Sequence, residues 1–120
     1  MSVQYSLILN SLYKKYYDEP IFEIVNNLLL NKDFTDIIVD IGELLENLID
    51  IENISSCQII NDIQIKLFEK INLNDAQKSK INEISEKNKK NILCATRPII
   101  HLECFITHLY LFLMDEYFIL

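Results

Sequence analysis

The stretch that decides the fold is PIIHLECFITHLYLFLMDEYF, residues 98–118. At about 100° per residue its apolar side chains surround the helix axis on all sides, which is typical of a core helix or a membrane span. His101, Glu103 and His108 interrupt it, and it lacks an uncharged run of the roughly 20 residues that a bilayer requires. We therefore predict a buried central helix and no membrane span.

The composition of the whole chain also favours helices. Its 120 residues include one Gly and two Pro, too few for the frequent turns of a sheet protein, and 50% of them are hydrophobic. A chain of this length and composition can therefore bury one sizeable hydrophobic core. We predict an all-α fold with a single domain, 1–120, built as a bundle of five to six helices around the hydrophobic C-terminal helix. The helices are expected at about 3–17, 20–31, 33–53, 56–71, from 75 onward, and 98–118, and the sequence leaves the end of the fifth helix open.

Local signals mark where two of these helices begin. Asp18 stands shortly before Pro20, as expected for a capping residue followed by a first-turn proline. Asn74 is followed three residues later by Gln77, the pattern of a capping box. The helix that starts there has few apolar residues, so we expect it to fray over residues 85–91.

Charge is spread unevenly along the chain. Residues 33–65 carry eight acidic side chains and no Lys or Arg, whereas residues 66–97 carry eight basic and four acidic side chains. Most of the acids lie on the arc of a predicted helix opposite its apolar side chains. Glu46 and Asp50 near its C-terminal end oppose the helix dipole, a local conflict that often marks a functional surface. The candidate partner-binding residues are Asp33, Asp36, Asp40, Glu43, Glu46 and Asp50 on this face, with Tyr16 and Tyr17 of the preceding helix as aromatic anchors.

An acidic face without internal cations is expected to bind a basic partner. The net charge of −7 argues against nucleic-acid binding, because phosphate contacts need Lys and Arg. The expected partner is a basic protein toxin, with a nuclease as the leading class. Charge complementarity would steer the two proteins together and fix their orientation. The alternative interpretation is an acidic surface that is only solvated.

The reactive side chains form no pattern that predicts an enzyme. His101, Cys104 and His108 share one helix face, but residues seven apart lie about 10.5 Å apart along the axis, too far for both histidines to bind one ion without a bend. A Cys104–His108 nucleophile pair lacks an evident oxyanion hole. Gly42 is the only glycine, so there is no phosphate-binding loop. Gly42 lies in the middle of a predicted helix, where it either permits close approach of another helix or is a tolerated surface residue. We expect no catalytic residue, no metal and no cofactor.

The cysteines and the N-terminus indicate the compartment. Three widely spaced cysteines do not suggest a disulfide framework and fit a reducing cytoplasm. The first fifteen residues, MSVQYSLILNSLYKK, lack a basic leader, so no signal peptide is expected. We predict a cytoplasmic protein, and the sequence leaves its oligomeric state open.

Residues 71–91, INLNDAQKSKINEISEKNKKN, resemble the late amphipathic helix of pediocin-like bacteriocin immunity proteins. The likeness covers about a sixth of the chain, and the strongly hydrophobic last helix departs from that family. The resemblance implies a small antiparallel helical bundle of the immunity-protein type. The overall picture is also similar to the acidic, cytoplasmic immunity proteins paired with secreted or contact-delivered toxins, which share a role more than a motif. Those proteins neutralise toxins, often basic nucleases, by blocking the active site with complementary charge, and no residue role carries over.

Two alternative functions remain open at this point. One is a helical regulatory module that binds an amphipathic helix in a groove beside the last helix, as viral apoptosis regulators do. The chain has no Trp, so it lacks the Trp-Gly motif of those proteins. The other alternative is a membrane-associated bacteriocin immunity protein. Neither a bacterial origin nor a phage or viral one follows from the sequence.

Overall fold

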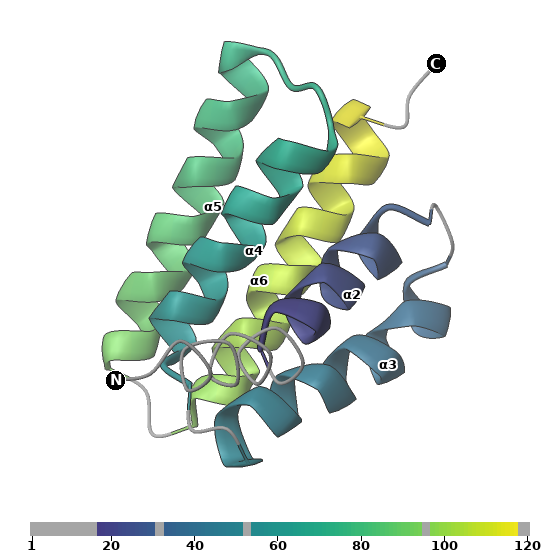
Figure 1. Cartoon of the computed structure of the whole chain (residues 1–120). Coiled ribbons are helices and arrows are strands. Elements are labelled where there is room, and N and C mark those ends of the chain that lie inside the picture. The colour runs from purple at the N-terminus through teal and green to yellow at the C-terminus, as the bar shows by residue number, and fades with distance from the viewer. Residues whose placement is uncertain (1–16, 31–32, 52–53, 95–96, 118–120) are drawn as a thin grey trace, which may run out of the picture.

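The computed structural model is an all-α bundle, as predicted, and it describes residues 17–30, 33–51, 54–94 and 97–117 (Figure 1). No strand occurs in these ranges. The predicted helix at 3–17 lies almost wholly outside them. Two helices continue without a break into a π-helical turn. The elements are α2 (Glu19–Leu28), α3 (Phe34–Glu46) followed by η2 (Asn47–Ile51), α4 (Ser56–Lys70), α5 (Asp75–Leu93), and α6 (Pro98–Phe112) followed by η3 (Leu113–Tyr117).

Successive helices run antiparallel. The α4, α5 and α6 helices stand side by side, and α2 and α3 form a second pair inclined to them (Figure 1). Helix α6 packs against α3, α4 and α5, whereas α2 packs against α3 and α4. Apolar side chains from each of these helices meet in one core, because the 3.6-residue period places them on the inward arc of every helix.

Helix α6 is a core helix on one face only. Ile100 (48% exposed) and Leu111 (51%) lie on its outer face together with the exposed Glu103 and Cys104. The prediction of a fully buried central helix was therefore too strong, because the neighbouring helices cover only one side of α6. The α6 side chains in the core are Leu102, Phe105, Ile106, Leu109 and Phe112.

The two predicted helix starts turn out differently. Asn74 and Gln77 form the capping box: the Gln77 N–H donates to Asn74 Oδ1 at 2.8 Å, and the Asn74 N–H donates to Gln77 Oε1 at 3.0 Å. Asp18 was predicted wrongly as a cap. Its backbone is already helical (φ −63°, ψ −44°) and its side chain makes no capping hydrogen bond. The Asp18 carboxylate instead lies 3.9 Å from the Lys66 ammonium.

Helix α5 is continuous to Leu93, so the predicted fraying over residues 85–91 was wrong. The reason is a pair of polar residues that face inward, Ser85 and Asn88. Asn88 Nδ2 donates to the Ile84 carbonyl at 2.8 Å and lies 3.3 Å from His108 Nδ1 on α6. The contact between Asn88 and His108 anchors the polar half of α5 to α6.

Gly42 does not mark a close helix crossing. A Cβ placed on this residue meets no heavy atom within 4 Å outside its own helix backbone. Of the two interpretations of Gly42, the structure supports the tolerated surface residue.

Candidate partner-binding surface

The acidic face of α3 and η2 is fully displayed to solvent. All six predicted carboxylates in this segment are exposed, while Ile37, Ile41 and Leu45 on the opposite arc are buried. The core therefore fixes the rotation of α3, and the rotation fixes which way the carboxylates point. The exposed residues are Asp33, Asp36, Asp40, Glu43, Glu46 and Asp50.

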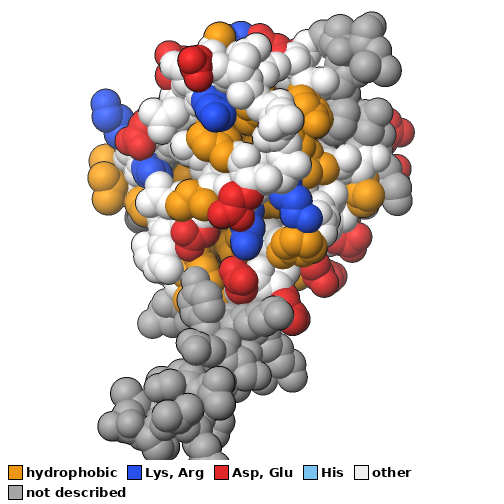
Figure 2. Space-filling view, turned by 45° about the horizontal axis from the view of Figure 1, so that its top comes forward, with side chains coloured by type: hydrophobic (Ala, Val, Ile, Leu, Met, Phe, Trp, Pro, Cys, Tyr) orange, Lys and Arg blue, Asp and Glu red, His pale blue; other side chains and the backbone are white. Residues whose placement is uncertain are grey.

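None of these carboxylates forms a salt bridge with any residue that the structure describes. The salt bridges among the described residues involve lysines of α4 and α5. Lys80 of α5 pairs with Glu116 of η3, and Lys89 pairs with Glu86 of its own helix. Two lysines of α5 thus pair with carboxylates away from α3. Figure 2 shows Asp and Glu side chains along the right-hand edge and also at the middle and left, whereas the Lys and Arg side chains visible on that face lie nearer its middle and left.

Helix α2 adds carboxylates that the sequence analysis missed. A cleft of about 250 Å³ between α2 and α3 is lined by Glu23 and Asn27 on one side and by Asp40, Glu43, Leu44 and Asn47 on the other. Three carboxylates and two amides therefore converge from two helices. The spacing of Glu19 and Glu23, one turn apart on the outward arc of α2, was the signal that could have found them. We call α3, η2 and this cleft the acidic surface.

The far end of the acidic surface meets a cation. Glu46 and Asp50 share a cleft of about 270 Å³ with Arg97, which precedes α6. No carboxylate–guanidinium pair within 4.0 Å is formed there among the described residues. An arginine in the same cleft lowers the net negative field at this end.

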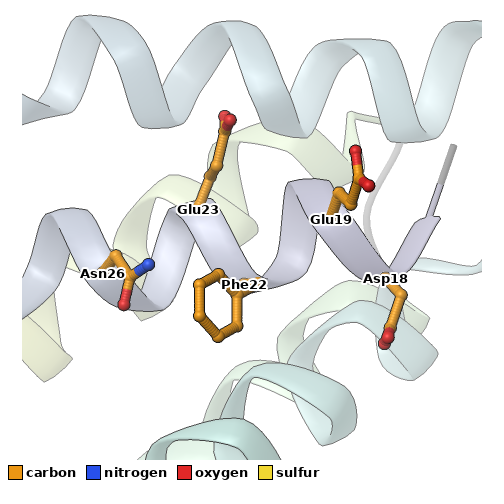
Figure 3. Close-up of a pocket in the computed structure, with 5 residues that line it drawn as sticks. All are labelled: Asp18, Glu19, Phe22, Glu23 and Asn26. Atoms are coloured by element: carbon orange, nitrogen blue, oxygen red, sulfur yellow. The ribbon is translucent and has the colours of Figure 1, made fainter. Parts of the chain in front are cut away.

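A second hollow lies on the outer surface of α2. It has a volume of about 500 Å³ and is lined by Asp18, Glu19, Phe22, Glu23 and Asn26. Phe22 and Asp18 point to one side of α2 in Figure 3, and Glu19 and Glu23 point to the other. The Lys70 ammonium from the end of α4 lies 3.8 Å from the centroid of the Phe22 ring. This hollow, the Phe22 pocket, joins the acidic surface through Glu23, which lines both.

Of the two predicted aromatic anchors, the structure describes only Tyr17, which is not displayed beside the acidic surface. Tyr16 lies outside the described residues. Tyr17 is only 3% exposed, and its hydroxyl donates a hydrogen bond to Asp62. The structure places Tyr17 in the core, so it does not provide the exposed anchor that we expected. Phe22, at 39% exposure, is the aromatic side chain that α2 presents to solvent.

The reactive residues of α6 do not gather into a site. His101 and His108 are half-buried and Cys104 is exposed. Within the described ranges, no group of three or more His, Cys, Asp or Glu side chains is placed to hold a metal ion. The carboxylates at the α2–α3 cleft form no such group either.

One helix in the described part of the chain is long and apolar enough to cross a membrane, Pro98–Tyr117, with a mean hydropathy of 1.2. A core helix of a soluble protein meets the same criteria, and α6 does contribute to the core. Comparison with known proteins adds nothing to this picture: no family model matches the sequence, and no curated protein matches it.

Proposed function

We propose that this protein is an immunity or antitoxin-type inhibitor that binds a basic protein toxin and neutralises it through the acidic surface. The observation that carries the proposal is the row of exposed carboxylates on α3 and η2, none of which has a salt-bridge partner among the described residues. Like charges on one helix face repel each other. A cationic partner removes that repulsion and gains complementary charge.

A nuclease is the proposed class of toxin. A nuclease must hold phosphates, so its substrate site is lined with Lys and Arg. Carboxylates spaced along a rigid helix offer such a site substitutes for phosphate groups. Glu23, Asp40 and Glu43 converge at the α2–α3 cleft and are placed to accept hydrogen bonds from a guanidinium. Occupation of the substrate site blocks the toxin, and the inhibitor performs no reaction.

The test begins with the identification of the partner. A tagged copy is expressed in the source cells, recovered at low salt and eluted with a salt gradient. We expect a single basic protein, released as salt screens the charges, with nuclease activity that the inhibitor suppresses. Recovery of the chain alone, or with an acidic protein, overturns the proposal.

A charge-reversal pair then tests the surface. Asp40, Glu43 and Asp50 are replaced together by Lys, and the control replaces Glu83, Glu103 and Asp115, exposed carboxylates of α5, α6 and η3. Each triple adds six charges and takes the net charge from −7 to −1. We expect the first triple to abolish capture and the control to retain most of it. Equal losses would show that only net charge matters, and no loss would exclude the acidic surface.

A second candidate function is association with membranes through α6, favoured by the length and hydropathy of Pro98–Tyr117. In that case the outer face of α6, with Ile100 and Leu111, would enter the interface. Flotation with lipid vesicles tests it. Co-flotation of the wild-type chain that an Ile100→Asp/Leu111→Asp variant loses supports this function, and absence of the chain from the vesicle fraction excludes it.

A further inference from the structure

The Phe22 pocket combines an aromatic ring with carboxylates. Its volume of about 500 Å³ lies within the range of about 300–1,000 Å³ found for ligand sites. Phe22 is 39% exposed and forms its apolar part. Asp18, Glu19 and Glu23 supply carboxylates, and Asn26 supplies an amide. A ligand that fits here needs an apolar stem and a positive charge.

The protein already places a cation on this ring. The Lys70 Nζ lies 3.8 Å from the centroid of Phe22, within the range at which the negative face of an aromatic ring attracts an ammonium group. Lys66 approaches the Asp18 carboxylate on the same side of α2 at 3.9 Å. The α4 side of the pocket is therefore supplied with cations by the chain itself.

The opposite side of the pocket has no such supply. Glu19 and Glu23 are exposed and have no salt bridge with any described residue. They point away from Phe22 across α2 in Figure 3. A basic segment that crosses α2 would therefore contact the ring with one cationic side chain and these carboxylates with another. Arginine meets this requirement better than lysine, because its planar guanidinium stacks on aromatic rings and binds carboxylates through two hydrogen bonds.

We propose that the Phe22 pocket receives an arginine side chain of the basic partner protein. The inference rests on the proposed function, since it assigns a specific contact within the same interface. Glu23 lines both the pocket and the α2–α3 cleft, so the arginine is continuous with the acidic surface. Arginine and aromatic residues are the types enriched at interface hot spots. Lys70 competes with the incoming arginine for the ring.

The probe is a fluorescently labelled hexa-arginine peptide, with hexa-lysine for comparison, and the readout is anisotropy at low salt. We expect the wild-type chain to bind hexa-arginine more tightly than hexa-lysine. Phe22→Leu keeps an apolar side chain but removes the ring, and we expect it to weaken hexa-arginine binding by about twofold to fivefold, the range of an exposed cation–π contact. It should also reduce the preference for arginine.

Two matched controls exist in the same chain. Phe68 is a partly buried ring outside the pocket with Lys78 at 6.0 Å, so Phe68→Leu should leave hexa-arginine binding unchanged. Lys70→Met and Lys78→Met remove the same charge, but only the first frees the Phe22 ring. We expect Lys70→Met to tighten binding more than Lys78→Met, and this excess should vanish in a Phe22→Leu background. Circular dichroism and urea midpoints confirm that each variant folds.

The outcomes separate the pocket from the proposed function. If Phe22→Leu binds hexa-arginine like the wild type while the Asp40, Glu43 and Asp50 triple does not bind, the pocket inference is overturned and the acidic surface stands. If Phe22→Leu weakens binding but the triple does not, the pocket stands and the acidic surface fails. No binding of hexa-arginine to the wild-type chain overturns both.

Discussion

Replacement of Gly42 by Ala is expected to stabilise the protein. Glycine in a helix interior costs about 1 kcal/mol relative to alanine, because its backbone loses more freedom on folding. A Cβ at residue 42 meets no heavy atom within 4 Å beyond its own helix, so the added methyl causes no clash and gains little packing. The expected gain is therefore the backbone contribution alone, about 0.5–1 kcal/mol in the free energy of unfolding.

The assay is urea denaturation followed by circular dichroism. We expect a higher midpoint with an unchanged slope, and a melting temperature raised by about 2–4 °C for a domain of this size. Val39, exposed on the same helix, is the control, because Val39→Ala changes helix propensity by a smaller amount, about 0.5 kcal/mol. A lower midpoint in Gly42→Ala would refute the reasoning, because it would show that residue 42 contacts another segment or leaves the helix.

Three further variants test other parts of the structure. Ser85→Ala removes a buried hydroxyl with no hydrogen-bond partner among the described residues, so the urea midpoint should correspond to a gain of about 1 kcal/mol. Asn74→Ala removes the capping box of α5 and should lower the free energy of unfolding by about 1 kcal/mol in the same assay, with Asn72→Ala outside the helix as the neutral control. Arg97→Gln removes the cation that faces Glu46 and Asp50, so labelled hexa-arginine should associate faster in stopped-flow measurements while its dissociation rate changes little. An unchanged association rate would show that Arg97 does not weaken the field of the acidic surface.

The fold was predictable because the apolar pattern of every described helix except α5 is clear. Ile37, Ile41 and Leu45 recur at four-residue spacing, and the structure buries all three. The start of α5 was equally clear, because the Asn74–Gln77 capping box depends only on residues three apart in the sequence. Local chemistry of this kind needs no knowledge of what lies on the other side of the core.

The errors arose where the outcome depended on a distant residue. Tyr17 was judged an exposed anchor, but Asp62 of α4 provides a partner for its hydroxyl and lets the ring enter the core. Asp18 was judged a cap, but Lys66 lies close enough to hold its carboxylate. The sequence pattern indicates that Asn88 is a surface residue, but in the fold it is buried beside His108 of α6. Each case is a tertiary contact between polar groups, which periodicity does not reveal.

In the candidate site, too, local features were predictable from the sequence and tertiary contacts were not. The exposure of Asp40 and Glu43 was implied by their arc on α3, because the apolar arc had to face the core. The contribution of Glu23 to the cleft was not, since its spacing from Glu19 indicates only exposure and nothing in the sequence says that this face of α2 packs beside α3. The sequence therefore predicts only the part of the acidic surface on α3, and the fold adds the carboxylate from α2.

The positions of the cations limit where a partner can bind on the acidic surface. Lys66 and Lys70 lie on the α4 side of the Phe22 pocket, beyond one end of the acidic surface, since one approaches Asp18 and the other contacts the Phe22 ring. Arg97 faces Glu46 and Asp50 at the η2 end. Between these ends the described residues supply no cation to the carboxylates of the α2–α3 cleft. The lysines of α5 and the carboxylates of α3 lie apart, so they do not gain the stabilisation that mixed charges on one surface would provide. Such a loss of stability is expected where function requires an unmixed surface. The footprint of a basic partner should therefore centre on the cleft that Glu23, Asp40 and Glu43 form, with the Phe22 pocket at its margin.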